Sequence, residues 1–319
     1  SLMMVTMLFT SSARAIASAR RVKEVLKEEN DIKDSPESTL MVNSGDIEFK
    51  NVSFRYYKDS PEEVLKDISF KINAGETIGI VGSTGSGKTT LVSLISRLYD
   101  ADEGEILVDG INVREYSLKN LRDGIGTVLQ KNVLFSGTIK ENLLWGDENA
   151  TDEEIKKVAS YAQAHGFIEN FTDGYDTVLG QGASNVSGGQ KQRLCIARAL
   201  LKKPKILILD DSTSAVDTAT EKKINEAFKN ELSSSTKIII AQRITSVINA
   251  DKIIVLDDGE AVGAGSHSEL LSSCSVYREI YSSQFLLYLL FQLNHYLIKN
   301  LKYLLLLLNH LQLLYILEN

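Results

Sequence analysis

The chain has 319 residues, of which 43% are hydrophobic and 24% are charged, an ordinary composition for a globular protein of one large or two modest domains. Its formal net charge of −7 and isoelectric point near 5.3 argue against a protein that binds the backbone of a nucleic acid. The two cysteines, Cys195 and Cys274, lack the spacing of a metal site and fit a reducing, cytosolic setting. No signal peptide pattern is visible, and the first residue is Ser1 rather than Met, so we expect a fragment of a longer protein.

Residues 1–45 differ in composition from the rest of the chain. A short apolar run, Leu2 to Phe9, precedes an Ala- and Arg-rich helical sequence from Ser12 to Glu29 and a polar linker from Asn30 to Gly45. The apolar run alone is shorter than the roughly 20 residues that cross a bilayer. It fits the last turns of a membrane-spanning helix, and it fits a frayed amphipathic helix equally well.

Residues 46–282 have the patterns of a globular α/β domain. β-type segments dominate the first part of this domain: Ile47 to Phe49, Val52 to Phe54 and Ile68 to Ile72. The apolar run Thr77 to Val81 then predicts a buried strand, and the run Leu91 to Ile95 predicts a helix.

A phosphate-binding loop pattern, G-x-x-x-x-G-K-[ST], lies between this strand and this helix. Its residues, with the one that follows, are Gly82, Ser83, Thr84, Gly85, Ser86, Gly87, Lys88, Thr89 and Thr90. The glycines let backbone N–H groups point at phosphate oxygens, and the helix start adds its positive end. Lys88 can reach the β- and γ-phosphates, and the Thr89 hydroxyl can bind Mg²⁺. The sequence therefore predicts a nucleotide site.

A second candidate anion-binding position lies in residues 185–193. Four residues open a helical stretch there: Ser187, Gly188, Gly189 and Gln190. A hydroxyl and bare N–H groups at a helix N-terminus favour an anion. Cys195 follows in the same stretch, and we expect it to pack as a small apolar side chain rather than to act as a nucleophile.

Three later apolar runs are short and uninterrupted, as in strands that are buried on both faces of a parallel sheet. They are Ile206 to Leu209, Lys237 to Ile240 and Ile253 to Leu256. The first run ends in Asp210, the usual acidic companion of a phosphate-binding loop, which would hold the Mg²⁺ shell. The sequence Asp257-Asp258-Gly259 predicts a hairpin turn.

Residues 283–319 form a tail that is rich in Leu, Tyr, Ile and Asn. Polar residues interrupt both halves of the tail, so neither half gives the roughly 18 clean apolar residues that predict a membrane span. We interpret the tail as a non-native, out-of-frame end. An amphipathic helix on a membrane surface is the alternative.

The order of these motifs resembles the ATP-binding cassette (ABC) transporter family. Val186 to Gln190 is similar to the family's signature sequence, Leu-Ser-Gly-Gly-Gln, and it lies between the phosphate-binding loop and the strand that ends in Asp210. The resemblance covers about residues 45–282. It implies an α/β fold, namely a P-loop NTPase cassette with a RecA-like core, an antiparallel β-subdomain and an α-helical signature subdomain. It also implies ATP and Mg²⁺ as cofactors.

The resemblance assigns roles to further residues. Tyr56 matches the aromatic residue that stacks on adenine, and Gln130 matches the glutamine that senses Mg²⁺ and faces the membrane domain. Asp217, in Ser214-Ala215-Val216-Asp217, matches the loop that crosses to a partner subunit. In the family two cassettes pair head to tail, so the segment Ser187–Gly189 would serve the partner's nucleotide.

Two segments are similar to exporters that carry their membrane and ATPase parts in one chain. One runs from Asn132 to Asn142, and the other, Ala17 to Leu26, resembles the link from the last membrane helix into the cassette. Importer ATPases are normally separate chains, DNA-repair relatives carry a long insertion, and translation-factor relatives carry two cassettes. We therefore expect an exporter cassette at the cytoplasmic face of the cell membrane. Residues 1–45 would be the end of its membrane domain, the rest of which is missing from this chain.

Two residues depart from the family pattern in the same ATP site. Active members place a glutamate, the general base, where this chain has Asp211, and a switch histidine where it has Gln242. The aspartate carboxylate is set back by about one C–C bond, which takes it out of hydrogen-bond reach, roughly 2.6–3.2 Å. An amide can donate and accept but cannot take up a proton. The expected catalytic residues are thus Asp211, Gln242 and Gln130, in a site that binds ATP better than it hydrolyses it.

This asymmetry resembles one half of a heterodimeric exporter. The chain would hold ATP as a clamp and complete the competent site of a second, different cassette subunit, and we expect no nucleic acid partner. A homodimer is the alternative. Two functions stay open: a transport ATPase that turns over slowly at its own site, and a regulatory module that holds ATP without hydrolysis.

Overall fold

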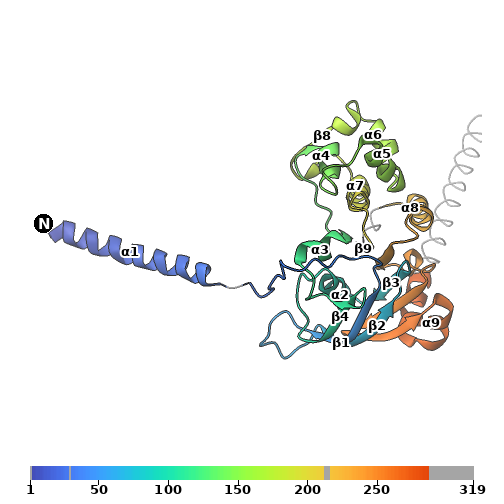
Figure 1. Ribbon diagram of the computed structural model, residues 1–319, viewed down its shortest axis with the longest axis horizontal. Coiled ribbons are helices and arrows are strands. Elements are labelled where there is room, and N and C mark those ends of the chain that lie inside the picture. The colour runs from blue at the N-terminus through green and yellow to red at the C-terminus, as the bar shows by residue number, and fades with distance from the viewer. Residues whose placement is uncertain (1, 29, 212–215, 287–319) are drawn as a thin grey trace, which may run out of the picture. The chain divides into compact units, whose positions relative to one another are not determined.

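The computed structural model describes residues 2–28, 30–211 and 216–286 (Figure 1). The chain divides into two compact units, with the division between Asp34 and Ser35. Residues 214 and 215 of the expected subunit-crossing loop, and the tail from residue 287 onward, lie outside the described residues.

The first unit is built on one helix, α1 (Leu2–Lys27), none of whose residues is buried. The predicted apolar run and the predicted Ala- and Arg-rich sequence are therefore parts of one continuous helix. Its most apolar 18-residue window has a mean hydropathy of 1.3 and few charges, so its length and composition suffice to cross a membrane. A signal sequence or the core helix of a soluble protein passes the same test.

The second unit contains an antiparallel sheet with the strand order β2-β1-β4-β5. Its strands are β1 (Ile47–Phe54), β2 (Leu65–Ile72), β4 (Glu103–Val108) and β5 (Ile111–Asn112). The two β segments expected before residue 55 are thus one strand. Its register against β2 is irregular between Phe49 and Val52, where Asn51 takes a left-handed φ of 49°.

A six-stranded sheet carries the phosphate-binding loop, with the order β12-β11-β3-β10-β9-β6. Its strands are β3 (Thr77–Gly82), β6 (Ile125–Val128), β9 (Ile206–Asp210), β10 (Thr236–Ile240), β11 (Lys252–Asp257) and β12 (Glu260–Gly265). All of them are parallel except the edge strand β12, which pairs with β11 as a hairpin. The parallel sheet predicted from the apolar runs and the hairpin turn predicted at Asp257-Asp258-Gly259 are both confirmed.

Helices surround this sheet and form a separate helical subdomain, as expected (Figure 1). The longer ones are α2 (Lys88–Ile95), α3 (Leu118–Asp123), α4 (Ile139–Leu144), α5 (Asp152–Tyr161), α6 (His165–Glu169), α7 (Gly188–Leu201), α8 (Thr218–Glu231) and α9 (His267–Ser273). The short pieces are the 3₁₀ turns η1 (Gly174–Asp176), η2 (Gln181–Ala183) and η3 (Ile244–Ser246), and the paired strands β7 (Gly137–Thr138) and β8 (Val178–Leu179). Residues 275–286 are also helical.

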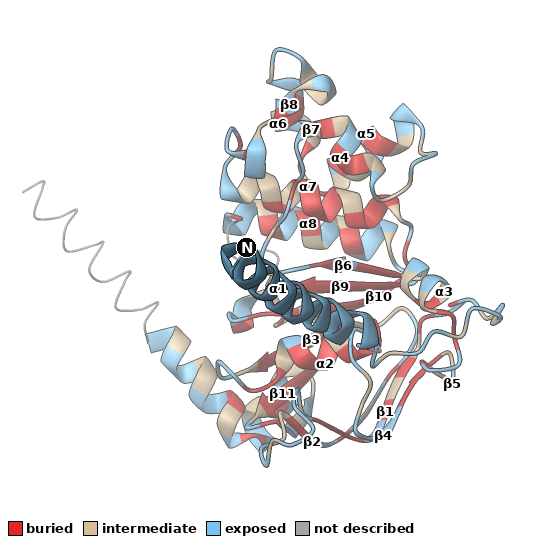
Figure 2. Cartoon of the chain, turned by 90° about the vertical axis from the view of Figure 1, so that its left-hand side faces the viewer, coloured by how far each residue is buried: buried red, intermediate tan, exposed pale blue. Residues whose placement is uncertain are grey.

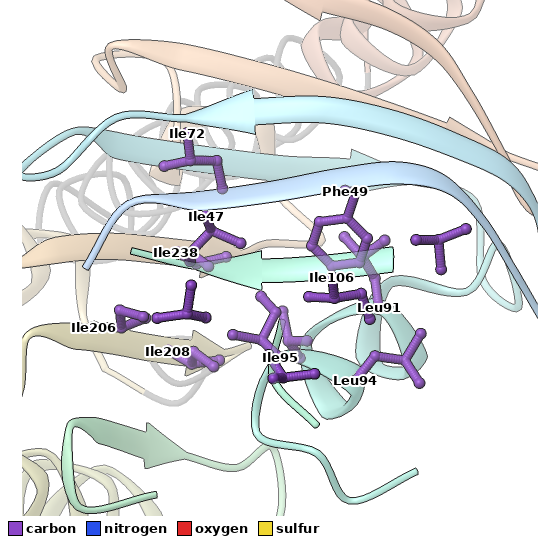
Figure 3. Packing of buried hydrophobic residues seen from close by; sticks show 14 of the residues in the cluster. Ile47, Phe49, Ile72, Leu91, Leu94, Ile95, Ile106, Ile206, Ile208 and Ile238 are labelled. Carbon is purple, nitrogen blue, oxygen red and sulfur yellow. The ribbon is translucent and has the colours of Figure 1, made fainter. Parts of the chain in front are cut away.

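Strand β9 shows why the apolar runs are uninterrupted. Ile206 and Ile208 pack into the cluster that the two sheets share with α2, whereas Leu207 and Leu209 pack into the cluster of the helical subdomain. Successive side chains of a strand point to opposite faces, so a strand covered on both faces needs an apolar residue at every position. Figure 2 shows β6, β9 and β10 as buried strands, and Figure 3 shows the α2 side chains against both sheets.

The segment before β1, expected to be polar linker as far as Gly45, packs against the body from Ser35 onward. Val42 is buried, and the Asp109 carboxylate accepts N–H bonds from Asn43 at 2.5 Å and from Gly45 at 2.6 Å, with a longer bond from Ser44. Burial alone would raise the pKa of Asp109. These donors outweigh burial and hold its pKa below the usual range.

Replacing Asp109 with asparagine is expected to lower the free energy of unfolding by about 1 kcal/mol at pH 7, because the N–H groups lose a charged acceptor. The folded-state pKa of Asp109 is depressed, so its contribution is present above the unfolded pKa of about 3.9 and disappears as pH falls toward the folded value. Urea unfolding at pH 7 and pH 3.5 measures both effects. A stability difference that is the same at both pH values would contradict this account. Asp123→Asn, which removes only a surface pair with Lys119, is the control.

Candidate functional site

The phosphate-binding loop connects the end of β3 to the start of α2. Gly85 and Gly87 have φ values of 86° and 93°, a left-handed region that favours glycine. Gly87 is the N-cap residue of α2 and offers no capping side chain, so the first N–H groups of the helix keep their direction toward an anion. The strand, loop and helix that the sequence pattern predicts are all present.

Gly87→Ala is expected to destabilise the protein by about 1–3 kcal/mol more than Gly85→Ala. Both positions carry nearly the same backbone strain, but a Cβ at Gly87 would lie 2.7 Å from Leu65 Cδ2 and 3.0 Å from the Val64 oxygen, whereas a Cβ at Gly85 would meet nothing within 4 Å. Comparing the two variants by urea unfolding therefore isolates the packing effect. Equal losses would show that space around Gly87 does not matter.

The Lys88 ammonium group lies within the loop. It donates to the carbonyl oxygens of Gly82 at 2.9 Å and Ser83 at 2.6 Å. Burial lowers the pKa of Lys88, and the nearby charges of Asp210 and Asp211 partly offset this effect. A half-buried ammonium held by neutral oxygens is well placed for the anionic oxygens of a nucleotide.

Thr89 and Asp210 meet although 121 positions separate them, because β10 is the only strand between β3 and β9. The Thr89 hydroxyl donates to Asp210 Oδ2 at 2.9 Å. Burial raises the pKa of Asp210, whereas the Thr89 hydrogen bond and Lys88 act in the opposite direction. These oxygen donors fit Mg²⁺, which typically binds one or two carboxylates together with substrate phosphates.

The described residues contain no cluster of three His, Cys, Asp or Glu side chains that could hold a metal ion. A magnesium ion at this site would be held by Thr89 and Asp210, whose side-chain oxygens lie 2.9 Å apart, together with oxygens of the nucleotide. When bound, it would neutralise charge that develops on the phosphates.

Two of the three expected catalytic side chains, Gln242 and Gln130, approach one carboxylate oxygen of the third, Asp211. Gln242 Nε2 donates to Asp211 Oδ2 at 2.9 Å, and Gln130 Nε2 lies 3.5 Å from the same oxygen. The Asp211 backbone has a left-handed φ of 46°, and its carbonyl oxygen accepts a bond from Gln192 Nε2 at 3.3 Å. The Asp211 carboxylate is thus occupied by amide donors.

Tyr56 lies beside the phosphate-binding loop. Its hydroxyl is 2.8 Å from the Thr90 hydroxyl, in the first turn of α2, and its ring packs edge-on against Phe54 and Tyr99. The side chain is 46% exposed, so part of the ring is open to a planar ligand such as a base.

The signature segment begins a well-capped helix. The Ser187 hydroxyl accepts the Gln190 N–H, and the Gln190 side chain accepts the Ser187 N–H, which forms a capping box at the start of α7. Gly188 and Gly189 are the first helical residues. Within the described part of the chain, no hydrogen bond joins this segment to the phosphate-binding loop. Cys195 is buried on the same helix, and burial raises the pKa of its thiol, as expected for a packing residue.

Asp217 caps α8. Its carboxylate accepts the Thr220 hydroxyl at 2.7 Å and the Thr220 N–H at 3.0 Å, and these two bonds hold the pKa of Asp217 below its usual range. The residue thus has a local structural role in addition to the expected role at a partner subunit.

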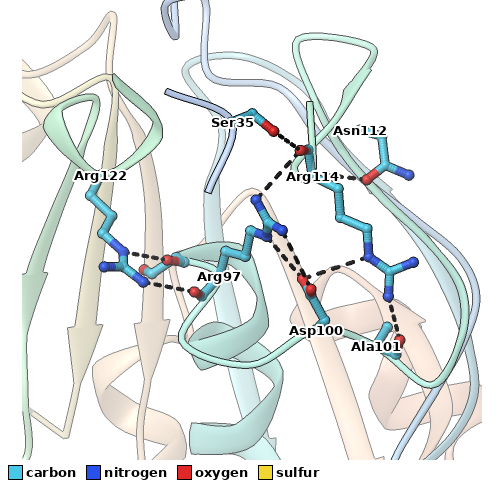
Figure 4. Close-up of polar contacts among 8 residues, drawn as sticks. Ser35, Arg97, Asp100, Ala101, Asn112, Arg114 and Arg122 are labelled. Carbon is cyan, nitrogen blue, oxygen red and sulfur yellow. Dashed lines mark hydrogen bonds and ion pairs between the residues drawn. The ribbon is translucent and has the colours of Figure 1, made fainter. Parts of the chain in front are cut away.

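Sequence reasoning missed three polar residues around the site. Arg122, on α3, donates to the carbonyl oxygens of Ser96 and Arg97 at the end of α2 (Figure 4). Lys202, at the end of α7, donates to the Arg122 carbonyl oxygen. Arg122 thus connects the C-terminal end of α7, the signature helix, to the C-terminal end of α2, the helix after the phosphate-binding loop. The third residue, Gln192, is a buried amide on an otherwise apolar helix face. Basic residues near helix ends are a recognisable signal, but their partners are not.

A groove of about 460 Å³ extends from this site between the sheet and the helical subdomain. Thr89 and Asp210 line it together with exposed apolar residues, among them Phe135 and Trp145, whose rings stack 4.7 Å apart. An exposed aromatic pair at a groove rim is typical of a docking surface. A larger cavity, about 710 Å³ beside α8, contains none of the predicted site residues.

Known proteins share this arrangement. The family profile named ABC transporter matches residues 65–214. The ABC transporter ATP-binding protein YfiB of Bacillus subtilis is 51% identical over 280 residues, which are 88% of this chain and 48% of that protein. YgaD of the same organism, named as a multidrug export ATP-binding/permease protein, is 44% identical over 86% of this chain and 47% of its own length.

A solved structure described as a bacterial Atm1-family ABC exporter with ATP bound matches with a TM-score of 0.81 at 36% identity, over 87% of this chain and 48% of that one. The chain thus spans about half the length of the curated relatives that it matches. At this TM-score and identity the chain shares the fold of that exporter over most of its length. The chain therefore carries the ATP-binding domain of the ABC transporter family.

Proposed function

We propose that this chain is the nucleotide-binding part of an ABC exporter and acts at the cytoplasmic face of the cell membrane. Residues 46–282 would be the cassette, and residues 1–45 would be the end of a membrane-domain helix and its linker. The length and apolar composition of α1 support this assignment, as do the export and permease functions in the name of YgaD. The groove with Phe135 and Trp145 at its rim would receive the membrane domain.

ATP and Mg²⁺ would bind at the phosphate-binding loop. Tyr56 would contact adenine, Lys88 would bind the terminal phosphates, and Thr89, Asp210 and Gln130 would surround the metal. In a head-to-tail pair of cassettes, residues 187–190 and Asp217 would act at the partner's nucleotide. ATP binding and hydrolysis in that pair would drive export.

We further propose that this chain's own ATP site holds nucleotide and hydrolyses it slowly, so that it forms a heterodimer with a competent subunit. One observation carries this proposal: Gln242 Nε2 donates to the Asp211 carboxylate at 2.9 Å. A carboxylate that already accepts an amide hydrogen is poorly placed to accept one from water, and glutamine cannot shuttle a proton.

A single-turnover experiment tests the proposal. The protein is loaded with labelled MgATP, chased with unlabelled ATP, and the bound label is identified over time. We expect most of the bound label to remain ATP. This result would fit both a site that hydrolyses ATP slowly and a site that holds ATP without hydrolysis. Conversion of bound ATP to ADP within seconds would refute the slow-site proposal and support an ordinary ATPase.

Ser187→Ala is expected to leave ATP binding by this chain unchanged but to reduce turnover in its dimer with a competent cassette subunit by about tenfold. The serine would serve the partner's nucleotide, and a charge-assisted hydrogen bond contributes about 1.5–3 kcal/mol. Loss of the helix cap also costs about 1 kcal/mol of stability. Ser266→Ala, which removes the corresponding cap of α9, is the matched control. Equal turnover in both variants would contradict the assigned role.

A further inference from the structure

The Gln284 side chain binds the backbone on both sides of Arg243, in the switch segment, residues 241–244, that follows β10 and contains Gln242. Gln284 lies in the helical residues 275–286, 42 positions after Gln242. Its Oε1 accepts the Ile244 N–H at 2.9 Å, and its Nε2 donates to the Gln242 carbonyl oxygen at 2.7 Å. One side-chain amide therefore satisfies the two backbone groups on either side of Arg243.

The two bonds act on a segment that has little regular structure of its own. Residues 241–243 connect β10 to η3, and Arg243 has extended backbone angles, φ −101° and ψ 124°. Around an extended residue, the C=O of the preceding residue and the N–H of the following residue point to the same side. In a sheet these two groups would form hydrogen bonds with an adjacent strand. The Gln284 amide takes the place of that strand.

The helix that carries Gln284 packs against the body of the protein through buried side chains. Tyr277 is fully buried and its hydroxyl lies 2.7 Å from His267 Nδ1. Ile280 and Tyr281 pack against a cluster that also contains Ile244 and Val247. A fixed helix can transmit its position to the switch segment, because the same apolar cluster supports both.

A continuous series of hydrogen bonds then leads to the nucleotide site. Gln284 binds the Gln242 backbone, the Gln242 side chain binds Asp211 Oδ2, and Gln130 approaches the same oxygen. We propose that Gln284 is a positioning residue that fixes Gln242 against Asp211. The C-terminal helix thereby sets how long ATP stays in this site. This inference rests on the proposed ATP-holding function.

The test compares Gln284→Leu with Glu279→Leu in the full chain. Leucine has nearly the size of glutamine but makes neither hydrogen bond, and Glu279 is an exposed residue on the same helix, so its replacement controls for a new apolar side chain. The measurements are the association rate and residence time of labelled MgATP, hydrogen exchange of the Ile244 amide, and the urea midpoint. The residence time measures how long ATP stays intact in the site, whether it is lost by release or by hydrolysis. The measurement therefore applies whether this site hydrolyses ATP slowly or not at all.

For Gln284→Leu we expect a residence time about fivefold shorter, about tenfold faster exchange at Ile244, and an unchanged association rate, because the phosphate-binding loop is intact. Gln284→Glu should also shorten the residence time, since its carboxylate can accept from Ile244 but faces the Gln242 carbonyl oxygen without a proton to donate. Glu279→Leu should match the wild type in all measurements.

Two results would overturn the inference. One is a wild-type residence time in both Gln284 variants. The other is a loss of ATP that occurs only together with a lower urea midpoint and faster exchange throughout the chain, which would mark a structural role alone. A wild-type protein that fails to bind labelled MgATP would instead refute the proposed function itself.

Discussion

Lys88→Ala is expected to weaken MgATP binding by about tenfold to a hundredfold. The ammonium group is half-buried inside the loop and is the only side-chain cation with a hydrogen bond to the described loop carbonyls, those of Gly82 and Ser83. A hydrogen bond between charged partners contributes about 1.5–3 kcal/mol, which corresponds to this range of dissociation constants. Titration with a fluorescent ATP analogue in the presence of Mg²⁺ measures the change.

The matched control is Lys66→Ala. Lys66 is a partly buried cation whose hydrogen bond to Asp258 raises its pKa, and it lies outside the loop. Its removal changes the net charge as Lys88→Ala does, so a general electrostatic effect would weaken binding in both variants. Similar dissociation constants for the wild type and Lys88→Ala would show that the loop does not hold the phosphates as inferred.

The parallel sheet and the phosphate-binding loop could be predicted because their signals are local. A strand buried on both faces must be apolar at every position, and β9 shows this in its Ile206 to Leu209 run. The loop needs glycine where φ is positive, so Gly85 and Gly87 are visible in the sequence. The same reasoning placed Asp210 at a strand end, and the strand order then brings it to Thr89.

Contacts between distant polar side chains could not be predicted. Nothing in the sequence near Gln284 indicates that its amide pairs with the backbone at Gln242, because a glutamine on a helix is ordinary. Asp109 likewise lies in an unremarkable turn, yet its carboxylate binds the segment that composition alone assigned to a linker. The bulge at Asn51, which joins two expected strands into one, depends on pairing with β2 rather than on residue types.

Restoring the family residues at both positions, Asp211→Glu with Gln242→His, is expected to raise the rate of ATP hydrolysis at this site by about a hundredfold. This is within the range that a positioned general base contributes. Each single change should give much less. A glutamate beside Gln242 could still accept the amide hydrogen that now occupies Asp211, and a histidine beside Asp211 would face a carboxylate that is set back from the water. Phosphate release by the two single variants and the double variant, with ATP in excess, measures this non-additivity.

Asp123→Glu controls for the longer acidic side chain, since it makes the same chemical change at an exposed position of α3 and is expected to leave this site's turnover unchanged. The result depends on how the Asp211 carboxylate is occupied. If the double variant binds MgATP but hydrolyses it no faster than the wild type, the hydrogen bond from Gln242 to Asp211 does not limit hydrolysis. The slow step would then lie elsewhere, and the leading physical reason would be the lack of a competent partner, whose signature helix would close the nucleotide from the opposite side in the proposed head-to-tail pair.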